Sequence, residues 1–251
     1  MAYDIRPLSF AEVLDSSFQV YRDNFILLAG IAAVAFVPEA LLIAIFRSGH
    51  RSVLIIGFLL TLILTPIMLI AATTAVASVY LDRPVTIVDA YRSARIIFTP
   101  VVGTILLKDV LGFLGLIALI VPGIYLIVAW SLVLPVTVIE HRFGITALRR
   151  SRQLVTGEWW NTLGIILVAA LLSWVPAWVF DTFWHFIPVV GPILTAVTES
   201  IATAYGYVVI VIYYFDRRCR LEGFDLRVLA EQVRTEGVAG AAPQAQPWSA
   251  N

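Results

Sequence analysis

Charged residues are scarce in this sequence of 251 residues. Only 14% of the positions are Asp, Glu, Lys or Arg, whereas 60% are hydrophobic. A soluble domain carries about 25% charged and about 45–50% apolar residues. A water-soluble core of this size could not bury the excess apolar surface, and a lipid bilayer removes that difficulty. The composition therefore excludes an ordinary soluble domain and predicts an integral membrane protein.

Cysteine and histidine are also rare. Cys219 is the single cysteine, so the chain can form no internal disulfide, and we expect it at the surface with no role. The histidines are His50, His141 and His185, which are scattered along the chain. The first twenty residues have no long apolar run, so we expect no cleavable signal peptide. There is no phosphate-binding glycine loop, dinucleotide fingerprint, serine-centred elbow or zinc spacing, and we therefore predict neither an enzyme nor a cofactor.

What the sequence does contain is a series of apolar runs long enough to cross a bilayer, which takes about 20 residues. The runs do not alternate as the strands of a membrane barrel would. We therefore predict an all-α, polytopic bundle. Its six transmembrane helices are expected at Phe25–Phe46, Val53–Leu81, Phe98–Ile120, Gly123–Ile139, Trp159–Trp184 and Pro192–Phe215, with a tight turn at Val121-Pro122-Gly123.

The basic residues lie mainly on one side of these spans. The segments before the first span, between the second and third, between the fourth and fifth, and after the sixth hold 2, 3, 4 and 5 Lys or Arg residues, 14 of the 17 in the chain. The opposite loops hold only Arg47 and Arg51, and Lys108 lies within a span. Because basic loops stay on the cytoplasmic side, both termini are predicted to be cytoplasmic. We expect the protein in the inner membrane of a bacterium.

The basic side also contains amphipathic segments, which we expect to be helices in the headgroup layer or beneath the bundle. Ser9 and Glu12 predict a capping box at the start of the first, and Thr86 an N-cap at the start of the second. The apolar faces are expected to be Phe10, Val13, Leu14, Ser17, Phe18 and Tyr21; Ile87, Ala90, Tyr91 and Ala94; Ala147, Leu148, Ser151, Leu154 and Val155; and Leu226, Leu229, Ala230 and Val233.

These segments and the spans form an internal repeat of one interfacial helix and two spans, at about 8–82, 86–140 and 144–216. Each unit starts and ends on the same side, so we expect three parallel helical hairpins about an axis along the membrane normal. Residues 1–235 would form the membrane domain and 236–251 a disordered tail. A shift of 134 residues aligns Leu14 with Leu148, Ser17 with Ser151, Gln19 with Gln153, Phe25 with Trp159 and Gly30 with Gly164.

Several stretches carry a family resemblance: Val121-Pro122-Gly123-Ile124-Tyr125, Leu134-Pro135-Val136, Ala147-Leu148-Arg149-Arg150-Ser151, Gly157-Glu158-Trp159-Trp160 and Tyr213-Tyr214-Phe215-Asp216. The chain resembles the membrane domain of the bacterial glycerophosphoryl diester phosphodiesterase family, which also occurs alone. The resemblance implies a six-span membrane domain. It does not imply hydrolysis, which in that family belongs to a separate barrel of about 250 residues. The roughly 35 residues after the last span are too few for such a barrel.

Ionisable residues inside spans are expensive, so they are candidates for function. Lys108 and Asp109 lie near the middle of the third span, and as helix neighbours they need not pair with each other. Lys108 could instead meet Glu39 of the first span or Glu199 of the sixth. The functional interpretation of these four residues is an ion, proton or polar-substrate site within the bundle. The alternative is a buried ion pair that fixes helix packing.

Two further groups have both a functional and an ordinary interpretation. Asp181 and His185 share a helical face and could bind a metal, but no third ligand is evident, and a solvated helix end among interfacial tryptophans explains them too. A set of six arginines could contact anionic lipid headgroups, although any membrane protein shows such a bias. They are Arg149, Arg150, Arg152, Arg217, Arg218 and Arg220.

The sequence names no substrate, and three functions stay open. The first is a membrane scaffold or accessory protein that organises lipids or partner proteins through its cytoplasmic helices. The second is a small transporter or lipid-handling protein with a polar site inside the bundle. The third, a membrane-embedded enzyme, lacks any supporting motif. The expected partners are membrane lipids, in particular anionic headgroups on the cytoplasmic face, and membrane proteins, but not nucleic acid.

Overall fold

The computed structural model describes residues 3, 5–46, 51–184, 186–187, 190–226 and 230, without the side chains of residues 39, 43, 45–46 and 51–54. The expected tail at 236–251 and most of the fourth amphipathic segment lie outside these residues. In the described part every regular element is an α-helix. The helices are α1 (Phe10–Asp23), α2 (Phe25–Phe46), α3 (Arg51–Tyr80), α4 (Ile87–Ala118), α5 (Ile120–Ala129), α6 (Val133–Ile139), α7 (Ile145–Val155), α8 (Trp159–Trp184) and α9 (Gly191–Glu222).

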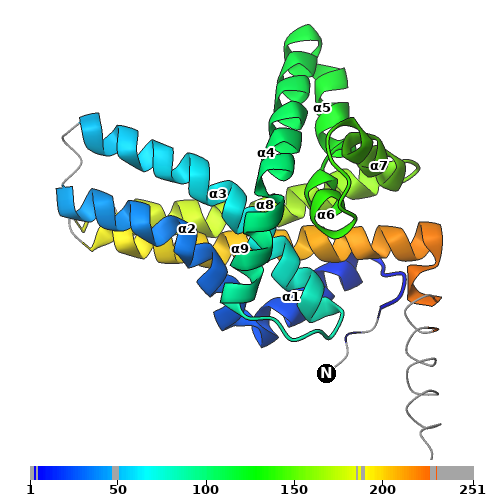
Figure 1. Ribbon diagram of the computed structural model, residues 1–251, viewed down its shortest axis with the longest axis horizontal. Helices are drawn as coiled ribbons and strands as arrows, with labels where there is room; N and C mark the ends of the chain where they lie inside the picture. Colours follow the sequence, from blue (N-terminus) through cyan, green and yellow to red (C-terminus); the bar gives the residue numbers. More distant parts are fainter. Residues whose placement is uncertain are drawn as a thin grey trace, which may run out of the picture.

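The structure confirms the all-α fold class. Six helical stretches are long and apolar enough to cross a membrane: α2, α3, α4, α5 with α6, α8 and α9. The two helices of each expected hairpin pack against each other, as α2 with α3, α4 with α5, and α8 with α9. Figure 1 shows that α4 and α5 leave the rest of the molecule in a different direction from α2 and α3. The arrangement of the three hairpins about a common axis is therefore not confirmed.

Two predicted helix boundaries were wrong, because the helices continue past them. The amphipathic segment from Ile87 continues without a break into the third span and forms the single helix α4 of 32 residues. The residues between Ala94 and Phe98 are Arg95, Ile96 and Ile97, none of which breaks a helix. Likewise α9 does not stop at Phe215 but continues to Glu222, where Gly223 adopts a left-handed C-terminal conformation with φ 57°.

The fourth span is broken rather than continuous. Its two helices, α5 and α6, are separated by Trp130, Ser131 and Leu132. The side chain of Ser151 in α7 bridges the break, because its Oγ donates to the carbonyl oxygen of Ala129 at 2.9 Å and accepts from the amide of Leu132 at 3.2 Å. These two bonds satisfy backbone groups that the break frees, which a buried site requires.

The turn between the third and fourth spans is not at Val121-Pro122-Gly123, as expected, because these residues lie inside α5. Leu119 alone separates α4 from α5, and Pro122 lies in the first turn of α5, where a missing amide proton costs little. Gly123 permits the close contact of the two helices. A Cβ atom at this position would lie 2.6 Å from the Cα of Leu116. The packing of the hairpin therefore depends on a glycine at residue 123.

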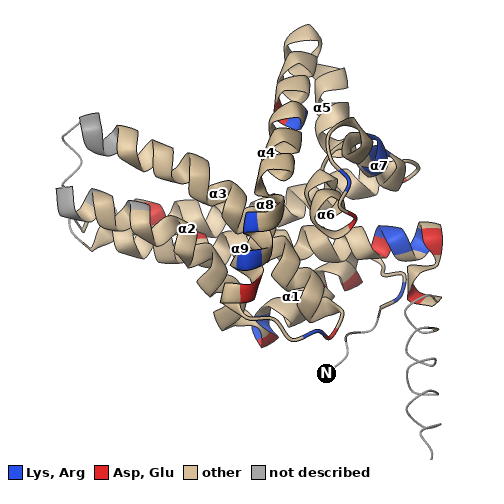
Figure 2. Cartoon of the chain, viewed as in Figure 1, with Lys and Arg blue, Asp and Glu red and all other residues tan. Residues whose placement is uncertain are grey.

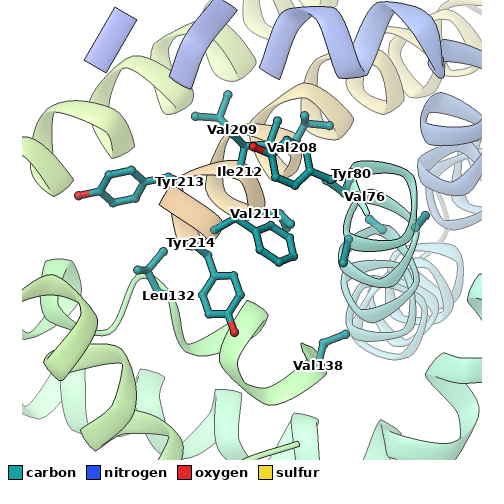
Figure 3. Close-up of a cluster of buried hydrophobic side chains, with 14 of the residues drawn as sticks. Val76, Tyr80, Leu132, Val138, Val208, Val209, Val211, Ile212, Tyr213 and Tyr214 are labelled. Carbon is teal, nitrogen blue, oxygen red and sulfur yellow. The ribbon is translucent and has the colours of Figure 1, made fainter. Parts of the chain in front are cut away.

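The core lies around the second half of α9, which packs on α1, α2, α3 and α8. Figure 3 shows Val76 and Tyr80 of α3, together with Leu132 and Val138, close to the run Val208–Tyr214 of α9. Tyr213, Tyr214 and Phe215 are among the largest fully buried side chains. Burial of aromatic side chains of this size supplies a large apolar contribution to folding. This packing fixes the position of the last turns of α9, which carry several charged side chains.

The amphipathic segments in α1, α4 and α7 have most of the local features that the sequence predicts. The capping box of Ser9 and Glu12 at the start of α1 is confirmed, as is the N-cap of α4 at Thr86. In α7 the whole expected apolar face is buried. In α1 the face is shifted slightly, since Val20 is buried while Phe18 is 58% exposed.

Candidate functional site

The four ionisable residues expected inside the bundle are only partly brought together. The Nζ of Lys108 lies 3.2 Å from Oδ1 of Asp109, so these neighbours do pair, because the long lysine side chain reaches across the angle between them. Asp109 remains 60% exposed on α4. Glu199 lies half-buried on α9, and the side chain of Glu39 is outside the described residues. A four-residue site within the bundle stays a prediction.

A second polar group, which the sequence did not single out as a unit, joins the ends of α6, α7 and α9. The guanidinium of Arg150 in α7 donates from Nε to both carboxylate oxygens of Glu140, at 3.0 and 2.9 Å. Its Nη2 also donates to Glu222 at the end of α9. The side chains of Arg150 and Glu140 are only 13% and 9% exposed. We refer to Glu140, Arg150, Tyr214, Arg218 and Glu222 as the ion-pair cluster.

Tyr214 and Arg218, one turn apart on α9, complete the cluster. The hydroxyl of Tyr214 donates to Oε1 of Glu140 at 2.9 Å and accepts from Nη1 of Arg218 at 3.4 Å. Arg218 also donates from Nε to Glu222 at 3.1 Å. Every polar group in the cluster therefore has a partner in at least two directions. Two arginines face two carboxylates, so the charges balance.

Charge balance and hydrogen bonding keep Arg150 ionised in spite of its burial. Desolvation acts to lower the pKa of the guanidinium, but the hydrogen bonds to Glu140 and Glu222 and their negative charges outweigh it and raise the pKa above the ordinary value. A charge in such a position costs much to bury alone and little when paired. The cluster is thus suited to fastening elements together rather than to exchanging protons.

The cluster borders a polar hollow of about 600 Å³, lined by Glu140, Arg142, Arg150, Arg218, Leu221 and Glu222. Arg142 adds one positive charge at its rim, with its Nε 3.2 Å from Glu140 and its side chain 53% exposed. A second hollow, of about 850 Å³, lies between the N-terminal segment, the α1–α2 junction and the loop after α3. Neither lining includes Lys108, Asp109 or Glu199.

The start of the chain is fastened to the end of α9 in a similar way. Asp216 accepts from the backbone amide of Leu8 at 2.7 Å, and Arg220 holds Asp216 at 3.0 Å while donating from Nη2 to the carbonyl oxygen of Leu8. Arg217 is 3% exposed and donates from Nε to the carbonyl oxygen of Leu154 in α7 at 2.8 Å. The last two turns of α9 thus contact both the N-terminal segment and α7.

The six arginines expected to contact lipid headgroups therefore fall into two groups. Four of them bind internal partners as described above: Arg150, Arg217, Arg218 and Arg220. Arg149 and Arg152 are exposed on the outer face of α7, and in the described part of the chain neither has a carboxylate partner. Figure 2 shows how the charged residues gather around α1, α7, the first turns of α4 and the end of α9.

The remaining candidates have ordinary surroundings. Asp181 accepts a hydrogen bond from Thr195 at 3.0 Å, across from α9 to α8. Its proposed partner His185 lies outside the described residues. Within those residues, no group of three or more His, Cys, Asp or Glu side chains is placed to hold a metal ion. Cys219 is buried, contrary to expectation, because α9 continues past Phe215 and stays packed on α1 and α7.

Residues 85–235 match the model of a family described as Domain of unknown function (DUF8558). The match covers more than half of the chain, so the chain belongs to this family. It includes α4 to α9 and the whole ion-pair cluster, whereas α1, α2 and α3 precede it. No curated protein and no solved structure matches the chain.

Proposed function

We propose that this member of the DUF8558 family is a membrane scaffold or accessory protein without catalytic activity of its own. The observation that carries the proposal is the ion-pair cluster. Its four charged side chains and the hydroxyl of Tyr214 bind one another at the point where the ends of α6, α7 and α9 meet. Such an arrangement keeps helix ends in fixed positions, which is what a surface that organises lipids or other proteins needs.

The pairing of Lys108 with Asp109 also supports a scaffold over a transporter. A lysine neutralised by its own neighbour has little need of a transported ion or polar substrate. The two hollows have linings that lie away from this pair. Transport or lipid handling through a polar site in the bundle remains the alternative function, and it makes a different prediction about the same two residues.

The proposal places the protein in the inner membrane of a bacterium, with both termini in the cytoplasm. The basis is the uneven distribution of arginines about the spans. Its partners would be anionic lipid headgroups on that face and other membrane proteins, and not nucleic acid. The resemblance to the glycerophosphoryl diester phosphodiesterase membrane domain fits this role, since that domain also occurs as a membrane part separate from the hydrolase.

A reconstitution experiment separates the two functions. Purified protein is placed in lipid vesicles, and the movement of ions and of a fluorescent phosphatidylglycerol between leaflets is measured against empty vesicles. A scaffold leaves both rates at the background level. Transport or lipid movement above background that disappears in the double variant Lys108→Met, Asp109→Leu would overturn the proposal. Retention of the folded variant, checked by size-exclusion chromatography in detergent, excludes simple unfolding as the cause.

A further inference from the structure

The amphipathic helices of the three repeat units occupy equivalent positions in the sequence. In the middle unit this helix is the first turns of α4. A shift of 134 residues places α1 on α7, and a shift of 57 places the start of α4 on α7. The burial of the side chains supports this equivalence. The residues at two equivalent positions are buried in all three helices. They are Val13 and Ser17 in α1, Ala90 and Ala94 in α4, and Ala147 and Ser151 in α7.

The contacts at the helix starts support the same equivalence. Ile87 is the first residue of α4, and Gly30 lies in the first span of unit one. A Cβ atom added at Gly30 would lie 3.0 Å from Cδ1 of Ile87. Phe10, the first residue of α1, lies 3.1 Å from the place of a Cβ atom at Gly164 in the first span of unit three. The two glycines are 134 residues apart, as the repeat requires. Two of the three amphipathic helices thus begin against the first span of another unit.

The opposite, exposed faces of two of these helices carry the same charges. Arg92 and Arg95 in α4 correspond, by the shift of 57, to Arg149 and Arg152 in α7, and all four residues are exposed. The equivalent residues of α1 are Asp15 and Phe18, which are exposed as well. Two units therefore present an arginine pair at spacing i, i+3 where the third presents an acid and an aromatic ring.

These four arginines are available for an external anion. Arg92 is 75% exposed and lies 3.9 Å from Asp89, itself 53% exposed, so solvent screens that pair. Among the described residues Arg95, Arg149 and Arg152 have no carboxylate partner, and the Cζ of Arg152 lies 5.9 Å from the ring centroid of Tyr125. Arg150 and Arg218 differ from these four, because both donate hydrogen bonds to carboxylates of the ion-pair cluster.

The span boundaries predicted from the sequence put both pairs at the depth of lipid headgroups. Arg95 precedes Phe98, the expected start of the third span, by three residues, or about 5 Å of helix. Arg152 precedes Trp159, the expected start of the fifth span, by seven residues, and the neighbouring Trp160 is 79% exposed, as is typical of aromatic residues at the membrane interface. Guanidinium groups one helical turn apart suit the oxygens of a phosphodiester.

We propose that Arg92 with Arg95 and Arg149 with Arg152 form two equivalent binding edges for the headgroup phosphate of anionic phospholipids. Unit one lacks such an edge, because Asp15 repels the phosphate. Anionic lipid is therefore enriched beside units two and three and not beside unit one. The inference rests on the membrane placement under the proposed function, but not on the absence of transport.

The test uses the full-length protein in nanodiscs of phosphatidylcholine and phosphatidylglycerol, with the lipids retained after mild detergent extraction identified by native mass spectrometry. Arg92→Gln with Arg95→Gln, and Arg149→Gln with Arg152→Gln, should each lower the retained phosphatidylglycerol by about half, since each removes one of two edges. The matched control is Arg6→Gln with Arg142→Gln. Both control residues are exposed but already paired with a carboxylate, so retention should not change.

The converse variant, Asp15→Arg with Phe18→Arg, should add a third edge and raise retention by about half again. An equal loss in the control variant would show a general charge effect and overturn the proposal, as would unchanged retention in both test variants. Displacement of phosphatidylglycerol by inorganic phosphate at constant ionic strength would assign the edges to free phosphate instead of lipid. Transport activity would overturn the scaffold function while leaving these results as they are.

Discussion

Two sets of ion pairs in this molecule differ in the distance along the chain that they connect. Lys108 and Asp109 are sequence neighbours on α4, and Asp109 stays largely exposed, so their pairing constrains no other element. In the ion-pair cluster, Arg150 joins Glu140 and Glu222, which are 10 and 72 residues away. The first pair neutralises a charge locally, whereas the second fixes tertiary structure. The same residue types therefore serve different purposes, according to which elements they connect.

The sharpest way to break this contrast is Arg150→Gln. The change leaves Glu140 and Glu222 mostly buried without their shared cation, and it should lower the free energy of unfolding by about 3 kcal/mol. The measurement is thermal unfolding in detergent, followed by circular dichroism. Arg142→Gln is the matched control, because Arg142 contacts the same Glu140 from an exposed position, and it should cost less than about 1 kcal/mol. Equal losses in the two variants would mean that burial does not distinguish them.

The bridge at the break in the fourth span should show the next largest effect. Ser151→Ala removes both bonds from the Oγ to the backbone of Ala129 and Leu132, at a cost of about 2 kcal/mol. In the described part of the chain Ser17, its equivalent in α1, bonds only to Val13 in its own helix, so Ser17→Ala should cost well under about 1 kcal/mol. Unfolding temperatures of the two variants give the comparison. A larger effect at Ser17 would argue against the bridging role.

The local pair on α4 should be nearly dispensable for folding. The double variant Lys108→Met, Asp109→Leu removes a pair that contributes within about 1 kcal/mol and leaves no unpaired charge. Its unfolding temperature in detergent should stay close to that of the unchanged protein. Lys108→Met alone should be worse, because Asp109 would remain charged on an apolar helix. A severe loss in the double variant would show that the pair binds another element after all.

The smallest expected effect is the pH dependence of the capping box at the start of α1. The hydrogen bond from Arg6, followed by those from Ser9, lowers the pKa of Glu12 from 4.5 to about 2. A lowered pKa stabilises the folded state above pH 4.5, and this contribution disappears as the pH falls toward 2. The protection factors of the α1 amides against hydrogen exchange, which are corrected for the intrinsic pH dependence of exchange, should therefore fall over that range. In Glu12→Gln, the protection factors should not change with this titration.

Much of the fold follows from local pattern. The apolar runs predicted six spans, and the period of the apolar residues in Ala147–Val155 predicted which face of α7 is buried, because both depend on short stretches of sequence. The separate helix expected before the third span did not occur, since no glycine or proline interrupts the chain between Ile87 and Phe98. The break in the fourth span had no local signal, because its bridging partner Ser151 lies in another helix.

For the candidate site too, some features follow from the sequence and others only from the tertiary structure. Composition and arginine placement alone determined that the chain is apolar enough for a membrane and that its basic residues lie in alternate segments, because hydropathy and charge are properties of each residue. Tertiary structure decided which arginines are bound and which are available. Arg149, Arg150 and Arg152 are indistinguishable in sequence, but only Arg150 points toward Glu140 and Glu222. That choice depends on how α6, α7 and α9 pack, and helix packing joins residues that no local pattern connects.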